Sequence, residues 1–427
     1  MKDNADSIIN EKKMSQTNKN KKESIKKINL IQKIEKLNLS QKQSKIINFI
    51  LIEIISILLP KAIFSKNFME IKVNKMGYNQ IISDDYNDTR PSRVIVNNLP
   101  ILMKNKKVYI ESINDLIYLE WPDDETEINV VSMFRNLDSI ISVNMNIFGK
   151  NGNLSYMFYN CKNLEEFSYS LNYDKSYSIQ DMRSMFYNCS SLLSFNFSYF
   201  YLGKYTTNLY HNVNFSYMFY NCYSLESIYI GSSDIGNIID MKGMFHNCIS
   251  ITSIDLTNIY ARDNVDISYM FYNCSKLESF TSNTIFIKDM KYMFYNCSLL
   301  NNITMSSFRN FMPSNYINMS NVFYNCYNLE SLQGKFSGLY ISDVREMFYN
   351  CISLLSLNFN PKGISKYINM SKMFYNCTNL KSTNLNNNHL HIFPTDLSYI
   401  FYNCISLTSL AFNYFKTDYL EEIIINI

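Results

Sequence analysis

Ten cysteines and four histidines carry the most reactive side chains of this 427-residue sequence. The cysteines occur one to a copy of a recurring motif, at intervals of 23–33 residues with a mean of 27, and no copy holds a second cysteine. Zinc needs clustered ligands such as C-x-x-C, which are absent from the sequence. The positions are Cys161, Cys189, Cys222, Cys248, Cys274, Cys297, Cys326, Cys351, Cys377 and Cys404.

Each cysteine is expected to be a buried free thiol. Extracellular proteins favour disulfides, but equivalent positions on stacked repeats point the same way, which is a poor geometry for a disulfide bridge. We therefore expect a ladder of thiols in which each cysteine acts as a small apolar side chain.

The histidines offer little for catalysis or metal binding. His246 takes the place of a tyrosine in its repeat, and His389 and His391 can share one side of a strand but have no third ligand. The sequence contains no Walker A loop, dinucleotide-binding glycine fingerprint or nucleophile elbow. We predict no enzymatic activity, no cofactor and no metal.

The cysteines belong to a repeat whose clear copies are residues 155–167, 184–195, 268–280 and 346–357. A period in the twenties that tolerates insertions is typical of a solenoid. A degenerate copy precedes these, with Leu137 in place of cysteine. The invariant core phenylalanines, three residues before each cysteine, are Phe158, Phe186, Phe219, Phe245, Phe271, Phe294, Phe323, Phe348, Phe374 and Phe401.

The residues around each phenylalanine predict a short helix. Asn or Asp stands five positions before it in eleven copies and can cap a helix. Apolar residues four and one before it, the phenylalanine itself and the cysteine share one face of a two-turn helix. The asparagine two positions after the phenylalanine tolerates the left-handed conformation that ends helices.

A short strand is predicted after each cysteine, because apolar and polar residues alternate there. Serine stands five positions after the cysteine in eight of ten copies, and varied polar residues stand seven after it. These outward positions form either a binding surface, as in other solenoids, or a merely solvated face. The candidate binding residues are Asn196, Tyr229, Asp255, Thr281, Thr304, Gln333, Asn358 and Asn384.

The predicted fold class is therefore an α/β solenoid, a leucine-rich-repeat-like stack of one short parallel strand and one short helix per repeat, preceded by a small β-rich region. The M-F-x-N-C-x-x-L signature of residues 129–413 resembles the BspA-like leucine-rich repeat surface proteins. That resemblance implies an extracellular, non-enzymatic binding solenoid of a family associated with adhesion.

Tyrosine follows the phenylalanine in nine of eleven copies, on the flank of the apolar face. Two interpretations stay open. The tyrosines pack between adjacent repeats with their hydroxyls in water, or they form a surface for a ligand or for self-association.

The N-terminal part divides by composition. Residues 1–45 carry twelve lysines against five carboxylates, a balance of +7, so the remainder carries −4 of the total of +3. A nearly neutral body argues against nucleic acid as a partner. The Lys-rich leader is either a solvated tail or a membrane-surface helix.

Residues 46–65 are the most apolar part of the chain, but Glu53 makes them a poor permanent anchor. A cleaved secretory signal, an uncleaved signal-anchor and a cytosolic helix remain the alternatives. Residues 66–128 alternate in short runs and predict a β-rich region. Residues 414–427 are a C-terminal end or a truncated repeat.

These features predict a secreted or cell-surface adhesion solenoid that recognises a large protein or glycan on another cell or surface. Membrane contact is expected only through the N-terminal segment, if it is uncleaved. The alternative is a cytoplasmic leucine-rich-repeat interaction scaffold.

We predict that residues 1–65 direct export, because a lysine-rich stretch precedes an apolar run too weak to anchor. Expression of the full chain in a secreting host, followed by N-terminal sequencing, tests this. A cytosolic product that retains residue 1 contradicts export and favours the scaffold.

Overall fold

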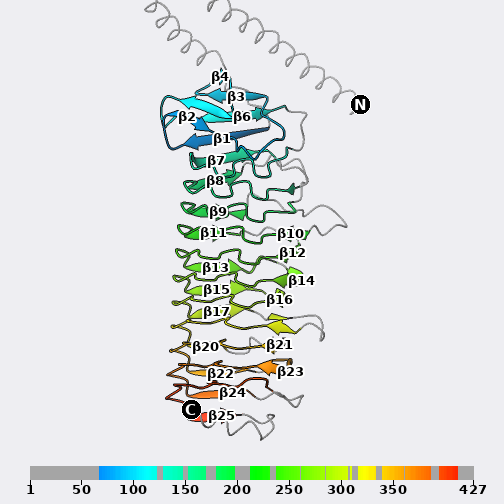
Figure 1. Ribbon diagram of the computed structural model, residues 1–427, viewed down its shortest axis with the longest axis vertical. Coiled ribbons are helices and arrows are strands. Elements are labelled where there is room, and N and C mark those ends of the chain that lie inside the picture. The colour runs from blue at the N-terminus through cyan, green and yellow to red at the C-terminus, as the bar shows by residue number, and fades with distance from the viewer. Residues whose placement is uncertain are drawn as a thin grey trace, which may run out of the picture. The chain divides into compact units, whose positions relative to one another are not determined.

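Each repeat is one rung of a stack, and neighbouring rungs are joined by parallel strand pairs and by backbone hydrogen bonds between their turns (Figure 1). The computed structural model describes the residue ranges 67–122, 128–147, 152–169, 179–197, 212–230, 237–259, 261–283, 285–305, 308–309, 316–332, 339–359, 361–385 and 394–411. All of them belong to the second of two units of the chain, residues 64–427. The leader, the apolar run and the C-terminal end named above lie outside these ranges.

One series of strands, the A strands, follows the cysteines. Their pairs are parallel and in register; Ser253 of β13, for example, lies opposite Ser279 of β15. The A strands are β7 (Ile140–Asn146), β8 (Glu166–Tyr169), β9 (Ser194–Asn196), β11 (Ser227–Tyr229), β13 (Ser253–Leu256), β15 (Ser279–Ser282), β17 (Asn302–Met305), β20 (Ser331–Leu332), β22 (Ser356–Asn358), β24 (Ser382–Asn384) and β25 (Ser409–Ala411).

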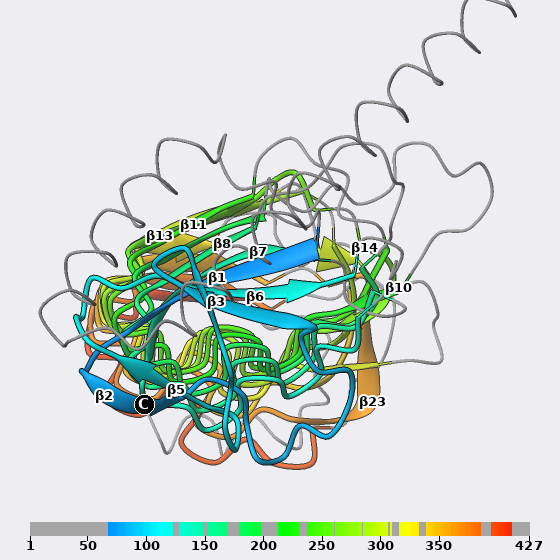
Figure 2. The same ribbon diagram turned by 90° about the horizontal axis from the view of Figure 1, so that it is seen from above.

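A second series, the B strands, lies between one A strand and the turns of the next repeat. Figure 2, which looks down the stack, shows A and B strands on different sides and the turns along a third. The B strands are β10 (Asn212–Asn214), β12 (Asn237–Asp240), β14 (Ala261–Asp266), β16 (Ile285–Asp289), β18 (Phe308–Arg309), β19 (Ile317–Asn318), β21 (Tyr340–Asp343) and β23 (Gly363–Asn369).

The predicted helix in each repeat is wrong, because none of the residues in the ranges above lies in an α-helix. The segment is instead two consecutive four-residue turns. In one repeat Met157 N donates to Leu154 O (3.4 Å) and Cys161 N to Phe158 O (3.0 Å). The third residue of each turn, Tyr156 or Asn160, has a φ near +60°. This is the conformation required at that position of a type II turn.

The reason for the error lies in the spacing. Two adjacent four-residue turns place their ends at i, i+3, i+4 and i+7, which is also the spacing of one helix face. Every second N–H group of the segment points along the stack rather than along a helix. Phe158 N donates to Met185 O (2.9 Å) and Asn160 N to Tyr187 O (2.7 Å) of the next rung. The fold is therefore a β-solenoid, with a turn pair where α/β architecture was expected.

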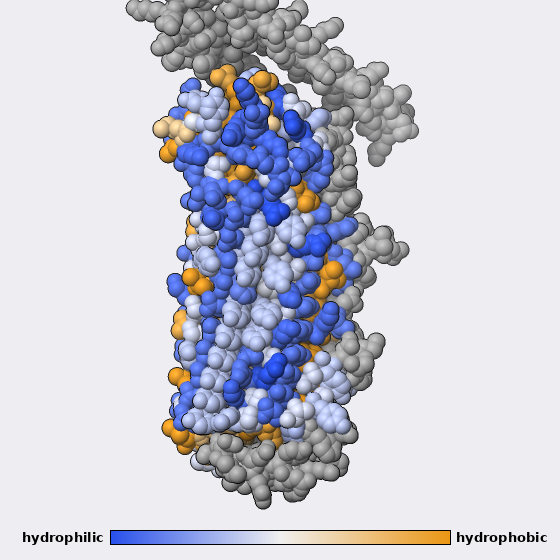
Figure 3. All heavy atoms as spheres, in the orientation of Figure 1, coloured by the Kyte–Doolittle hydropathy of each residue, from blue (hydrophilic) through white to orange (hydrophobic). Residues whose placement is uncertain are grey.

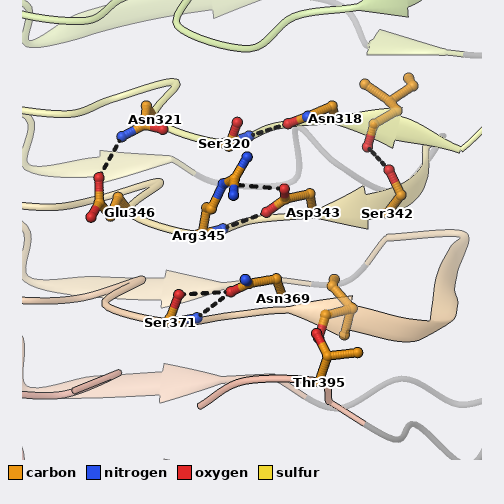
Figure 4. A network of polar contacts seen from close by, with 12 residues as sticks. Asn318, Ser320, Asn321, Ser342, Asp343, Arg345, Glu346, Asn369, Ser371 and Thr395 are labelled. Atoms are coloured by element: carbon orange, nitrogen blue, oxygen red, sulfur yellow. Dashed lines mark hydrogen bonds and ion pairs between the residues drawn. The ribbon is translucent and has the colours of Figure 1, made fainter. Parts of the chain in front are cut away.

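The Asn or Asp that begins each repeat accepts a hydrogen bond, although no helix follows it. Its side-chain oxygen binds the N–H two residues ahead, an Asx turn; Asn318 does so with Ser320 (2.8 Å) and Asp343 with Arg345 (3.0 Å). Figure 4 shows these contacts and the neighbouring Asn321–Glu346 bond on consecutive rungs. The same contact occurs at Asn129, Asn153, Asp181, Asn214, Asp240, Asp266, Asp289, Asn369 and Asp396.

Apolar side chains from all three sides of the rungs fill the interior. The core phenylalanines stack ring on ring from Phe134 to Phe401, with centroids 5.2–5.6 Å apart and planes within 10°. Each rung thus repeats the same contact with the next, as expected of a quasi-one-dimensional fold.

The N-terminal strands pair mainly antiparallel with one another and contact the first rung through β1 and through the segment that follows β2, where Ser83 N donates to Met133 O (2.8 Å) and Tyr86 Oη to Asn129 O (2.6 Å). β1 lies antiparallel to β7, the first A strand, so it covers the strand edge that begins the stack. Within the described ranges no helix is long and apolar enough to cross a membrane. The six strands are β1 (Asn67–Val73), β2 (Gly77–Gln80), β3 (Arg93–Val96), β4 (Leu99–Ile101), β5 (Lys107–Ile110) and β6 (Ile117–Trp121).

The left-handed asparagines generate a stability prediction. Asn273 has a φ of 60° and donates through Nδ2 to Asn247 Oδ1 (3.0 Å). Asn273→Gly loses that bond, at about 0.5–1.5 kcal/mol. Asn273→Ala loses it and also forces an ordinary side chain into the left-handed region, for about 1–2 kcal/mol more. Urea unfolding should rank wild type above the glycine variant and the glycine above the alanine variant; equal losses contradict the backbone argument.

Candidate binding faces

The outward side of the A strands, here called the strand face, is built by in-register pairing. In β13 and β15 the inward residues Ile254 and Phe280 are at most 3% exposed. Because side chains alternate along a strand, the positions on either side of them point outward. Parallel pairing without a register shift then aligns each outward position with its equivalent on the next rung.

The structure places the candidate residues on this face in columns. Tyr229 (61% exposed), Asp255, Thr304 and Asn358 are exposed. Asn196, Thr281 and Asn384 are half-buried, and Gln333 lies outside the described ranges. Register pairs Tyr229 with Asn196, Thr281 with both Asp255 and Thr304, and Asn358 with Asn384.

A second outward column runs beside these residues. Serines two positions earlier in the strands lie opposite one another, Ser227 with Ser194 and Ser356 with Ser382. Hydroxyl and amide groups both donate and accept, so the face offers neutral hydrogen-bonding groups on successive rungs. Exposed glutamates stand at its margin in some repeats, at residues 226, 278 and 330.

The tyrosines after the core phenylalanines form a continuous stack along the turns. Rings on neighbouring rungs lie 4.3–4.7 Å apart from Tyr159 to Tyr402, with His246 in the middle, and the Arg135 guanidinium covers the Tyr159 ring at 4.9 Å. Both ring faces of an internal tyrosine are thus occupied by neighbours. Burial raises the pKa of Tyr187 and Tyr324 to about 12. A partner at this stack meets ring edges and hydroxyls only.

A second set of tyrosines in the turns was not predicted from the sequence. Tyr156, Tyr217, Tyr269, Tyr292 and Tyr399 occupy the left-handed position of the first turn, with φ values of 56–58°. Treating the segment as a helix gave this position no special backbone role. One signal was present, since the fourth cysteine-bearing copy has glycine here. A Cβ on Gly243 would lie 2.8 Å from the Tyr217 ring, so the glycine makes room for that tyrosine.

Figure 3 shows side chains of intermediate hydropathy in a column down the stack, flanked by more hydrophilic ones.

The asparagines that end the turns form a ladder of polar side chains along the stack. Most successive pairs are joined by an Nδ2–Oδ1 hydrogen bond, for example Asn350 to Asn325 (2.8 Å) and Asn376 to Asn350 (2.9 Å). The asparagine side chains of the turns thus hydrogen-bond to neighbouring rungs, whereas many outward strand residues remain exposed to solvent.

All ten cysteines are buried and free. Each Sγ donates to the carbonyl oxygen of the core phenylalanine one rung earlier, at 2.8–3.2 Å. Burial raises the pKa of the Cys161 and Cys404 thiols to about 12. Because the thiolate is the nucleophile, these positions favour a structural role for the thiols.

The described residues contain no group of three or more His, Cys, Asp or Glu side chains able to hold a metal ion. His246 is sandwiched between Tyr220 and Tyr272, with centroids at 4.3 and 4.6 Å. His211, His389 and His391 lie outside the described ranges. The turns and strands together define a β-solenoid repeat protein whose candidate site is an extended surface.

Comparison with known proteins places the chain in a family. Residues 125–208, 152–283, 201–306 and 288–414 match the family described as Mycoplasma protein of unknown function, DUF285. These matches cover most of the chain, which therefore belongs to this family. No curated protein shows significant sequence similarity to it.

Solved structures similar to this chain include bacterial leucine-rich repeat proteins. One from Bacteroides ovatus is 17% identical with a TM-score of 0.33, covering 74% of this chain and 80% of its own. A leucine-rich cell surface protein from Faecalibacterium prausnitzii is 14% identical, with a TM-score of 0.24 and coverages of 71% and 86%. An internalin from Listeria monocytogenes is 18% identical, with a TM-score of 0.24 and coverages of 60% and 69%.

His246 generates a pH prediction. Burial lowers its pKa from 6.5 to about 4, so protonation favours the unfolded chain. The stability linked to this group is present above pH 6.5 and is lost as the pH falls to about 4. His246→Tyr restores the tyrosine of the other repeats and should reduce the fall in melting temperature across that window. An identical fall in both proteins contradicts the assignment.

Proposed function

We propose that this chain is a non-enzymatic binding protein of a cell surface, of the BspA-like type, which holds a large protein or glycan along its strand face. One observation carries the proposal: in-register pairing aligns outward polar side chains into columns that run across successive rungs. In a solenoid, such a face is the surface to which every repeat contributes.

The chemistry of the columns fits an extended, hydrogen-bonding partner. Serine, threonine and asparagine side chains each contribute a net hydrogen bond of about 0.5–1.5 kcal/mol. A useful affinity then requires several rungs to engage at once, which a large protein or a polysaccharide can do and a small molecule cannot. The tyrosine stack is the poorer candidate, because its ring faces are already covered.

The proposal contains no catalytic step. The described cysteines are buried and donate to backbone carbonyls, which leaves no accessible thiolate on either face. Export by residues 1–65 is part of the proposal. An intracellular interaction scaffold using the same face is the alternative, and the fate of the leader distinguishes the two.

Lysine substitution of exposed strand-face residues tests the assignment. The triple variant Tyr229→Lys/Thr304→Lys/Asn358→Lys places three bulky charges on the face and removes three hydrogen-bonding groups. Binding to an array of immobilised glycans and to a panel of purified extracellular matrix proteins should weaken by about tenfold or more. Melting temperature should change little, because these side chains face solvent.

A matched control carries the same charges elsewhere. Tyr223→Lys/Ile352→Lys/Ile405→Lys alters exposed residues that immediately follow cysteines, before the strands begin. It should bind as wild type does. If the control loses binding while the strand-face variant keeps it, the site lies on the turns, and the strand-face assignment is wrong.

A further inference from the structure

The N-terminal strands expose large apolar side chains more fully than most repeats do. Met76 is 65% exposed, Tyr78 68%, Tyr109 54% and Leu102 94%. Figure 3 shows hydrophobic side chains gathered at the end of the stack that carries β2 and β4. Clusters of exposed apolar side chains on a soluble fold mark interaction sites.

Strand pairing explains why the two tyrosines share a surface. In the β2–β5 sheet Tyr78 lies opposite Tyr109, and their ring centroids are 5.1 Å apart in an edge-on contact. The alternate residues of β5, Val108 and Ile110, are at most 1% exposed. One side of the sheet therefore packs on the core, and the other presents tyrosines to solvent.

Two exposed lysines lie beside the tyrosines. Lys107 belongs to β5 and lies opposite Gln80, and Lys104 pairs with it in an antiparallel bridge. That bridge brings the segment containing Leu102 to the start of β5. We name Met76, Tyr78, Leu102, Lys104, Lys107 and Tyr109 the cap patch. It combines apolar tips, amphipathic tyrosines and positive charge.

We infer that the cap patch docks on the surface of an anionic lipid bilayer. Tyrosine and lysine side chains suit this interface, because their apolar parts enter the headgroup region while their polar ends stay hydrated. Lysines near the surface are attracted to anionic headgroups. The patch thereby extends membrane contact beyond the N-terminal segment to which the sequence alone confined it.

The sequence ahead of the described residues argues for a membrane as the occupant. Twelve lysines in residues 1–45 precede the apolar run 46–64, and β1 begins at Asn67. Any membrane that receives this run lies only a few residues from the first strand of the fold. A signal or signal-anchor run brings the chain to a bilayer during export, and the lysines of the cap patch favour a bilayer surface that carries anionic lipid.

A single fluorophore in the full chain tests the contact. Leu102→Cys provides a reactive thiol while the ten native cysteines are buried, so an environment-sensitive dye attaches at residue 102. Mixed with vesicles of phosphatidylcholine containing about one quarter phosphatidylglycerol, the dye should shift to the blue and be quenched by spin-labelled lipid. The same dye at Asn358→Cys, on the strand face, should do neither.

Charge reversal gives a second measurement. Lys104→Glu/Lys107→Glu should raise the lipid concentration needed for half of the residue-102 shift by about thirtyfold or more, because two lysines attracted to anionic headgroups become glutamates that the headgroups repel. Lys276→Glu/Lys381→Glu, on exposed lysines of the repeats, should not change it.

Three outcomes overturn the inference. Protein that sediments with vesicles while the dye at residue 102 stays in water binds through its leader alone. Protein that does not sediment has no membrane contact. A blue shift that grows with protein concentration in the absence of lipid identifies a second copy as the occupant. None of these results bears on the strand face, whose test uses other residues.

Discussion

Hydrogen bonding between one rung and the next is the constraint on which this protein depends. In the turn pair, the N–H groups of Phe158 and Asn160 have their partners in the following repeat, not in their own. A single repeat would leave those groups unpaired, at a cost comparable to a lost hydrogen bond for each one buried. The phenylalanine stack and the thiol-to-carbonyl bonds repeat this dependence in the side chains. Order in one rung therefore requires order in its neighbours.

The same constraint explains what sequence reasoning captured of the fold and what it missed. The period, the strand after each cysteine, the burial of Phe271 and Cys274 and the acceptor role of Asp266 all follow from spacing and residue chemistry. The turn pair could not be predicted in this way, because two four-residue turns and a helix share the same apolar spacing. Only the direction of the hydrogen bonds separates them, and a pattern within one repeat carries no information about bonds between repeats.

The candidate faces show a similar division. Alternation along a strand is local, so the outward placement of Tyr229 and Asn358 could be read from the sequence. Whether the tyrosine rings are covered depends on the distance between rungs, which the sequence does not give. The sequence therefore could not decide between packing of the tyrosines and a tyrosine binding surface. The cap patch depends on a pairing between Tyr78 and Tyr109, which lie 31 positions apart in a region without repeats. A periodic sequence pattern cannot predict a contact of this kind.

The direction of the inter-rung bonds has a mechanical consequence. In parallel rungs these bonds run along the axis of the stack, as the bond from Phe245 N to Met270 O illustrates. A tensile load along that axis opens the bonds of one rung before those of the next, so the stack peels at low force from an end. A load spread across many rungs of one face shares the strain among all of them. The stack therefore resists force least when it is pulled between a tether and a partner at its opposite ends. It resists force most when a partner is bound along the strands of many rungs.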